Sequence, residues 1–314
     1  MRKYIFISLS LIIGFLILII FYLSSFGIKT NKFNSIINEQ IKNFDQNLSL
    51  ELNDVFLKLK LKEKTIKIHT SNPKLFSGKS SIELSKIDVN LGLIRFLKNE
   101  NSIKKIEITT KENTIKKITD FINSYKFNLQ QFIIFNQIDK GLVKIAANIY
   151  FDKDNQNDYQ YSVTGEIKEA RLNILDRALI NNINLCFKIE KQNFIFENIK
   201  LKFDNIDFES AKTTIKKIEN NFKVKGDINS KKSIVDPNSI AKLLNLNFDF
   251  IDQKEMLIES NNDFSFNIDT NRHVRELNFK SNLIFDKIII NKKYQDLIFL
   301  KDGKIVTNYS NKNL

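Results

Sequence analysis

Hydrophobic residues change their spacing along the 314-residue chain, and each spacing predicts a different element. The run from Tyr4 to Leu23 contains no charged residue. As a helix rising 1.5 Å per residue, it would cross about 30 Å, the hydrocarbon thickness of a bilayer. Arg2 and Lys3 precede it, and Tyr4 and Tyr22 stand where interfacial aromatic residues belong. The pattern predicts a membrane anchor that includes Tyr4, Leu11, Gly14, Leu18 and Leu23.

A cleaved signal peptide is the alternative to this anchor. Its apolar core would be about 7–15 residues long and would end at a small-x-small cleavage site. The run here is longer, and Ser24-Ser25-Phe26-Gly27 matches such a site poorly. We therefore expect residues 1–30 to form an uncleaved anchor, with the amino end inside and the bulk of the chain exported.

Three later segments have the spacing of amphipathic helices. In residues 31–47 the apolar positions lie three and four apart, and the helix would either lie on the bilayer or, as we favour, cap the domain behind it. Residues 113–127 repeat this pattern. A third helix is predicted to begin at Asp236-Pro237, an N-cap followed by proline in the first turn.

Most of the remaining chain alternates with a period of two, which predicts half-buried antiparallel strands joined by short turns. Examples are Leu57–Leu61, Ile82–Leu91, Phe194–Phe203 and Phe264–Ile268. The motif V-x-G-[DE]-I occurs at residues 163–167 and 224–228 and hints at a repeated hairpin unit. The spacing predicts a mainly β chain built as a meander rather than from βαβ units.

The apolar strand faces can be interpreted in two ways. They could pack against each other in a closed sandwich, which periodicity alone favours, or they could form the floor of an open trough for acyl chains. In the second case the expected lipid-lining residues are Leu57, Leu59, Leu61, Phe187, Phe196, Phe203, Phe222, Phe264 and Phe266.

Composition narrows the chemistry. The net charge of +13 comes from lysines scattered over the wet positions of the strands, which an AT-rich coding sequence explains better than a nucleic-acid footprint does. One cysteine and two histidines exclude an intramolecular disulfide and multi-Cys or multi-His metal sites. We therefore expect no nucleic-acid partner and no cofactor.

Catalytic motifs do not stand out. Phosphate-binding loops and nucleophile elbows are absent from the sequence. His69 and His273 have no motif around them and are interpreted as solvated side chains, while Cys186 is a small filler or a bystander. A hydrolase is the weakest hypothesis, and we expect no enzymatic activity.

The order of parts adds a resemblance. An anchor and an amphipathic helix precede SSIELSKIDVNLGLI at residues 80–94 and IKKIEI at residues 103–108, and FIIFNQIDKGLVKI follows at residues 132–145. This order resembles the amino-terminal region of AsmA-like envelope proteins, the group that includes TamB and YhdP. These motifs are degenerate hydrophobic patterns, although the architectural likeness covers most of the chain. Members of the group are usually much longer.

The resemblance implies an elongated antiparallel sheet curled into a groove, with a single N-terminal transmembrane helix and a few short amphipathic helices. It implies residues 1–30 as anchor, 31–127 as amphipathic helix, first β region and helix, and 128–314 as the groove region. The protein would lie in the inner membrane with its bulk in the periplasm. It would bind phospholipid acyl chains, with other envelope proteins as further candidate partners, and assist lipid transport or envelope homeostasis. The alternative is a membrane-tethered adaptor with a closed β core and no lipid.

Overall fold

The computed structural model describes residues 2–31, 34–53, 55–98, 102–125, 137–152, 159–174, 178–203, 206–238, 254–271, 273–289 and 299–311. The helices are α1 (Arg2–Ser25), α2 (Asn34–Phe44), α3 (Leu93–Leu97) and α4 (Ile115–Tyr125). The first strands are β1 (Ile28–Thr30), β2 (Leu48–Glu51), β3 (Val55–Lys60), β4 (Thr65–Ser71), β5 (Lys74–Ser77), β6 (Ser80–Gly92), β7 (Ile103–Thr110), β8 (Asn113–Thr114) and β9 (Ile138–Phe151). The later strands are β10 (Tyr159–Ile174), β11 (Ala178–Glu190), β12 (Asn193–Phe203), β13 (Ile206–Ile218), β14 (Asn221–Val235), β15 (Met256–Ile268), β16 (Val274–Ile289) and β17 (Phe299–Asn311).

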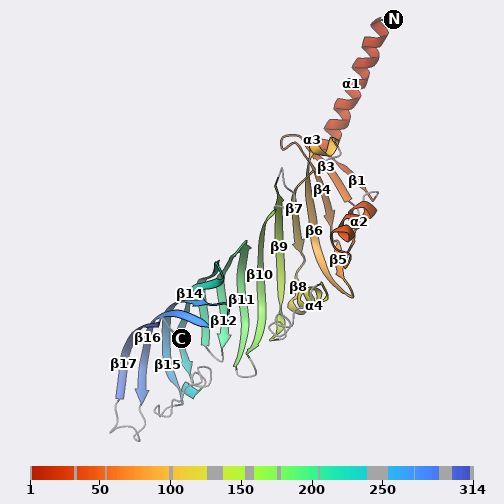
Figure 1. Ribbon diagram of the computed structural model, residues 1–314. Coiled ribbons are helices and arrows are strands. Elements are labelled where there is room, and N and C mark those ends of the chain that lie inside the picture. Colours follow the sequence, from red (N-terminus) through yellow and green to blue (C-terminus); the bar gives the residue numbers. More distant parts are fainter. Residues whose placement is uncertain are drawn as a thin grey trace. The chain divides into compact units, whose positions relative to one another are not determined.

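The chain is mainly β, and its strands belong to one long, open antiparallel sheet (Figure 1). Two compact units divide it. Unit 1 comprises residues 1–113, 117–127 and 144–163, and unit 2 comprises residues 114–116, 128–143 and 164–314. The predicted mainly β antiparallel class is therefore confirmed.

In unit 1 the strands pair in the order β1–β3–β4–β6–β7–β9, and a ribbon of β2 and β5 continues along β6. A bulge between Leu84 and Lys86 shifts the alternation of β6, so that Ile82 and Leu84 pack on the same side as Ile87. The helices α2 and α4 cover this end of the face, where buried Leu50, Ile82 and Leu84 pack with Ile37, Ile41, Ile118 and Phe121. Helix α2 thus caps the sheet, as favoured from its sequence.

Helix α1 joins unit 1 through a tight junction. Gly27 follows the helix with a φ of 75°, and a Cβ placed there would lie 2.5 Å from the Leu57 carbonyl oxygen and 2.7 Å from Phe56 Cζ. Only glycine fits this approach without rearrangement. In α1, side chains are described at Tyr4 and from Ser10 onward, and all of those from Ser10 to Tyr22 are exposed.

Within the described part of the chain, no helix has both the length and the apolar character needed to cross a bilayer.

Unit 2 contains a meander in which each strand from β11 to β17 pairs antiparallel with the next. Irregular positions recur in neighbouring strands: Asn182 in β11 and Asn198 in β12 have positive φ, and the β13–β14 register shifts between Glu209 and Thr213. Asparagine tolerates this left-handed conformation better than most residues. Each irregularity resets the alternation, so that Ile199 and Leu201 line a pocket together with Phe264.

Several strands extend beyond their predicted ends, notably β10 and β13, whereas β5, α3 and β17 were not predicted. The predicted helix at Asp236-Pro237 is helical at Pro237 and Asn238, and the rest of it lies outside the described residues.

Candidate functional site: two open apolar sheet faces

The apolar face of unit 1 continues past the part that the helices cover. Leu57 and Leu59 on β3 pair with Ile68 and Ile66 on β4, and the row continues through β6, β7 and β9. These leucines and isoleucines are half-buried and lie outside the buried cluster around Leu84. Leu61, predicted as the next strand position, lies instead in the β3–β4 turn and is 48% exposed.

The six predicted phenylalanines lie on strands of unit 2. Phe187 and Phe196 are cross-strand partners, and the register pairs Phe222 with Ile268, Phe264 with Gly226 and Phe266 with Val224. All five phenylalanines in these pairs are half-buried, whereas Phe203 is buried at 7% exposure. The sixth residue, Phe203, is thus a packing residue more than a lining residue.

The phenylalanine rings lie close to the backbone of the sheet. A Cβ at Gly226 would approach Phe264 Cζ to 2.9 Å and Thr213 Oγ1 to 2.5 Å, so the Phe264 ring covers this glycine. The rings of Phe264 and Phe266 stack with centroids 6.1 Å apart. Beside them lies a pocket of about 110 Å³, whose apolar lining residues are Ile199, Leu201, Phe208, Ile228 and Phe264.

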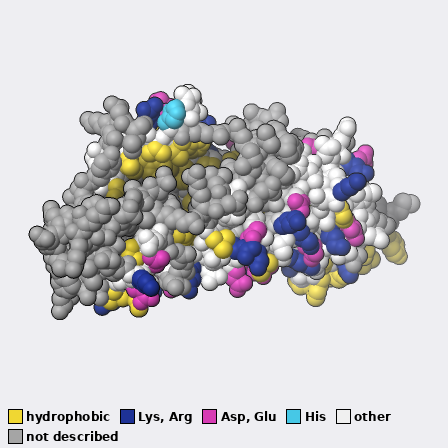
Figure 2. Space-filling view, turned by 90° about the horizontal axis from the view of Figure 1, so that it is seen from below, with side chains coloured by type: hydrophobic (Ala, Val, Ile, Leu, Met, Phe, Trp, Pro, Cys, Tyr) yellow, Lys and Arg dark blue, Asp and Glu magenta, His cyan; other side chains and the backbone are white. Residues whose placement is uncertain are grey.

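The strands that carry these faces belong to one sheet, and the described residues do not include a second sheet packed face to face on it. Figure 2 shows hydrophobic side chains gathered inside a hollow on the side of the molecule that it views. A closed sandwich would instead bury such side chains between two sheets.

A polar band interrupts the apolar face of unit 2, and the sequence did not reveal it. The Ser230 and Ser260 hydroxyl groups lie 2.9 Å apart, and Asn262 donates to Ser260 Oγ at 3.0 Å. Ser281 donates to Asn262 Oδ1 at 2.7 Å. On one side of the band lies a buried cluster of Ile206, Val235, Met256, Ile258 and Phe285. The band groups bond to one another, so their hydrogen bonding does not require a ligand.

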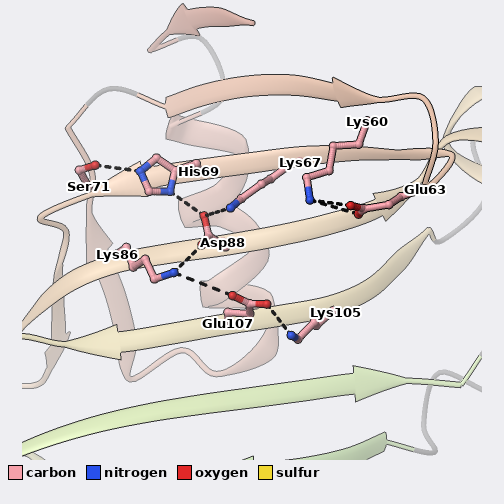
Figure 3. Close-up of polar contacts among 9 residues, drawn as sticks. All are labelled: Lys60, Glu63, Lys67, His69, Ser71, Lys86, Asp88, Lys105 and Glu107. Carbon is pink, nitrogen blue, oxygen red and sulfur yellow. Dashed lines mark hydrogen bonds and ion pairs between the residues drawn. The ribbon is translucent and has the colours of Figure 1, made fainter. Parts of the chain in front are cut away.

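The opposite face of unit 1 carries a network of charges centred on Asp88 (Figure 3). The Asp88 side chain is 1% exposed and contacts Lys67 Nζ at 3.1 Å, His69 Nδ1 at 2.6 Å and Lys86 Nζ at 3.0 Å. Burial alone would raise the pKa of Asp88, but hydrogen bonds from His69, Lys86 and Lys67 outweigh burial and hold this pKa below its usual range. The network ties β4 to β6.

Within this network, Ser71, His69 and Asp88 are connected in the same order as the residues of a Ser-His-Asp catalytic triad. His69 Nε2 lies 2.9 Å from Ser71 Oγ, while its Nδ1 contacts Asp88. The sequence had indicated no orienting partner for His69, because Asp88 comes from another strand. Catalysis by a triad also needs hydrogen-bond donors for the oxyanion, in a site shielded from bulk solvent. Here His69 is 32% exposed on a sheet face, and Asp88 shares its charge with two lysines, which favours a structural network.

The other polar candidates are exposed. His273 lies near the β15–β16 turn, where its backbone N–H donates to Asp269 Oδ1 at 2.8 Å. Cys186 points away from the face that carries Phe187 and is exposed, so it is not a buried filler.

Comparisons with known proteins add no family or function: no family model, curated protein or solved structure matches the chain.

Proposed function

We propose that the protein is held at a membrane by α1 and binds lipid acyl chains along its apolar sheet faces, in lipid transport or envelope homeostasis, without enzymatic activity. The observation that carries this proposal is the half-buried state of the leucine and phenylalanine faces on a single sheet. Contiguous apolar surface of this kind marks a binding site. Each methylene of an acyl chain that leaves water there contributes about 0.8 kcal/mol.

The anchor part of the proposal is supported by the surface of α1. Leu11 and Leu18 are 70% and 65% exposed, and the helix is apolar on all sides from Leu11 to Leu23. A helix that is apolar all round is stable only when lipid or protein covers it. Arg2 and Lys3 favour the amino end on the cytoplasmic side, with the bulk of the chain in the periplasm. The AsmA-like groove remains the architecture that fits these features.

Native mass spectrometry of gently purified full-length protein tests the lipid part. We expect co-purifying phospholipid that is lost in Phe264→Asp and Phe266→Asp, because a carboxylate on the floor is costly to bury beside an acyl chain. Ser265→Asp is the matched control, because Ser265 lies between the two phenylalanines on the same strand and points to the other face.

Equal loading of these three variants would contradict the proposal, as would a wild-type protein without lipid. If the lipid-free protein instead bound an envelope protein stably, the adaptor function would replace the lipid-binding one.

A further inference from the structure

The end of the unit 1 sheet next to α1 exposes a group of large apolar side chains. It consists of the β3–β4 turn, residues 61–64, and of α3 with Lys98, and we name it the α3 tip. Leu61 is 48% exposed, Ile94 60%, Phe96 45% and Leu97 72%. Helix α3 contains no buried residue. A five-residue helix that turns its apolar side chains outward does not stabilise the core of its own unit.

The two parts of the tip are joined, because the Leu93 N–H donates to the Lys64 carbonyl oxygen at 3.0 Å. The register also places the tip beside α1. Thr30 pairs with Val55 and Ile28 with Leu57, so the chain leading back to α1 runs along β3 toward the turn that follows it. Figure 1 shows α3 next to the base of α1.

Helix α1 also exposes apolar surface at its base. A recess of about 430 Å³ at the base of the helix is lined by Leu18, Ile19, Phe21, Tyr22, Leu23 and Ile28. Tyr159, at the start of β10 in the same unit, is 57% exposed and packs against Phe151 at 6.4 Å between ring centroids. Tyrosine with an apolar ring and a polar end is typical of the bilayer interface.

Cations surround the apolar tip. Lys62, Lys64, Lys98 and Lys104 are exposed around it, and its carboxylate Glu63 pairs with Lys60 at 2.9 Å. Basic side chains around exposed leucine and phenylalanine match an anionic bilayer surface, in which headgroups meet the cations and acyl chains accept the apolar side chains. With Glu63 paired to Lys60, the exposed charges of this rim are mainly positive, which favours an anionic surface.

We infer that the α3 tip inserts into the interface of an anionic phospholipid bilayer as a second membrane contact beside α1, holding one end of the unit 1 apolar face against the lipid. This inference rests on the membrane anchoring proposed above and adds the surface through which the domain itself meets the membrane. This contact would place the bilayer, from which lipid would be taken, next to the apolar face of unit 1 that carries Leu57 and Leu59.

The absence of tryptophan allows a direct test, because one introduced tryptophan reports only its own surroundings. The reporters are Phe96→Trp in the tip and Ile218→Trp on β13, since the native side chains are 45% and 46% exposed. Full-length protein is reconstituted into phosphatidylethanolamine vesicles with or without phosphatidylglycerol, and brominated lipid serves as quencher. We expect a shift to shorter wavelength and loss of emission for Phe96→Trp alone, stronger with phosphatidylglycerol and weakened by salt. Adding Ile94→Asn and Leu97→Asn should abolish both effects.

Equal, unquenched emission from both reporters in vesicle-bound protein would overturn the tip contact but leave the anchor in place. A wavelength shift without quenching by brominated lipid would also overturn it, because protein would then cover the tip. Conversely, quenching that persists when Leu11→Lys and Leu18→Lys disable α1 would support the tip contact and show that it does not depend on the anchor. A chain that fails to bind vesicles at all overturns both.

Discussion

Replacing Asp88 by asparagine removes one buried charge while keeping the side-chain shape. The carboxylate is 1% exposed and meets three basic groups within 3.1 Å. Hydrogen bonds to charged groups contribute about 1.5–3 kcal/mol each, but Lys67 and Lys86 are 30% and 40% exposed and can turn toward water once Asp88 is neutral. We therefore expect Asp88→Asn to lower the free energy of unfolding of unit 1 by about 2–3 kcal/mol at pH 7.

This loss should depend on pH in a defined direction. The pKa of Asp88 is lowered from 3.8 in the folded protein, so its charge stabilises the fold above about pH 4, and this contribution disappears as the pH falls through the folded pKa. The difference in unfolding free energy between wild type and Asp88→Asn should reach its full size at pH 7 and nearly vanish well below pH 3.8. The ordinary pKa of an aspartate, 3.8, marks the upper edge of that window.

Hydrogen exchange of β4 and β6 peptides, followed by mass spectrometry in increasing urea, measures the effect within unit 1 alone. Labelling times at each pH are scaled to the intrinsic exchange rate. Asp263→Asn is the control, because Asp263 is an exposed strand carboxylate in unit 2. A change below about 0.5 kcal/mol at pH 7, the range of ordinary surface substitutions, would refute the reasoning, as would a gap that stays constant down to pH 3.

Gly27→Ala should destabilise the junction of α1 and β3, because the new Cβ would meet the Leu57 carbonyl oxygen at 2.5 Å. Faster hydrogen exchange of the β3 amides measures this loss. Gly14→Ala is the control, because a Cβ at Gly14 would have no atom within 4 Å. Phe285→Ala, at a site 4% exposed in the buried cluster, should cost about 3–5 kcal/mol in urea unfolding of lipid-free protein, clearly more than Phe266→Ala at its half-buried site. Wild-type protein should not react with a fluorophosphonate probe; labelling that Ser71→Ala abolishes would establish the Ser71–His69–Asp88 group as catalytic.

The alternating segments of the sequence located most of the sheet, because antiparallel strands with one wet face carry their period in the residues themselves. Breaks in that period were also informative. The step from Leu84 to Ile87 violates a period of two, and the structure places a bulge there. In contrast, the sequences of β17 and of the second half of β13 have polar residues at both odd and even positions, which hides these strands from a hydrophobic pattern.

The repeated V-x-G-[DE]-I motif has different local roles in its two copies. In β14, Asp227 accepts hydrogen bonds from the Ala211 and Lys212 N–H groups at 3.1 and 3.2 Å and so holds the irregular stretch of β13. In β10, Glu166 instead pairs with Lys168 at 3.2 Å. Short-range similarity could not distinguish these roles, because each depends on the neighbouring strand.

The candidate site was only partly predictable for the same reason. Alternation identified the apolar phenylalanines, but it did not show that Phe203 is buried where it pairs with Ile180 on β11 and Ile206 on β13. The charge network could not be foreseen either, since Asp88 meets His69 only through the β4–β6 pairing.

The pairing of β11 to β17 with their sequence neighbours has a consequence for how the chain is made. No strand in this described series must wait for a partner from a distant part of the sequence, so loop-closure entropy stays small at each step. As the chain emerges, each new hairpin can add to the strand before it. An apolar face assembled in this order can bind acyl chains strand by strand. This shortens the time during which exposed, unpaired strands that carry phenylalanine could aggregate.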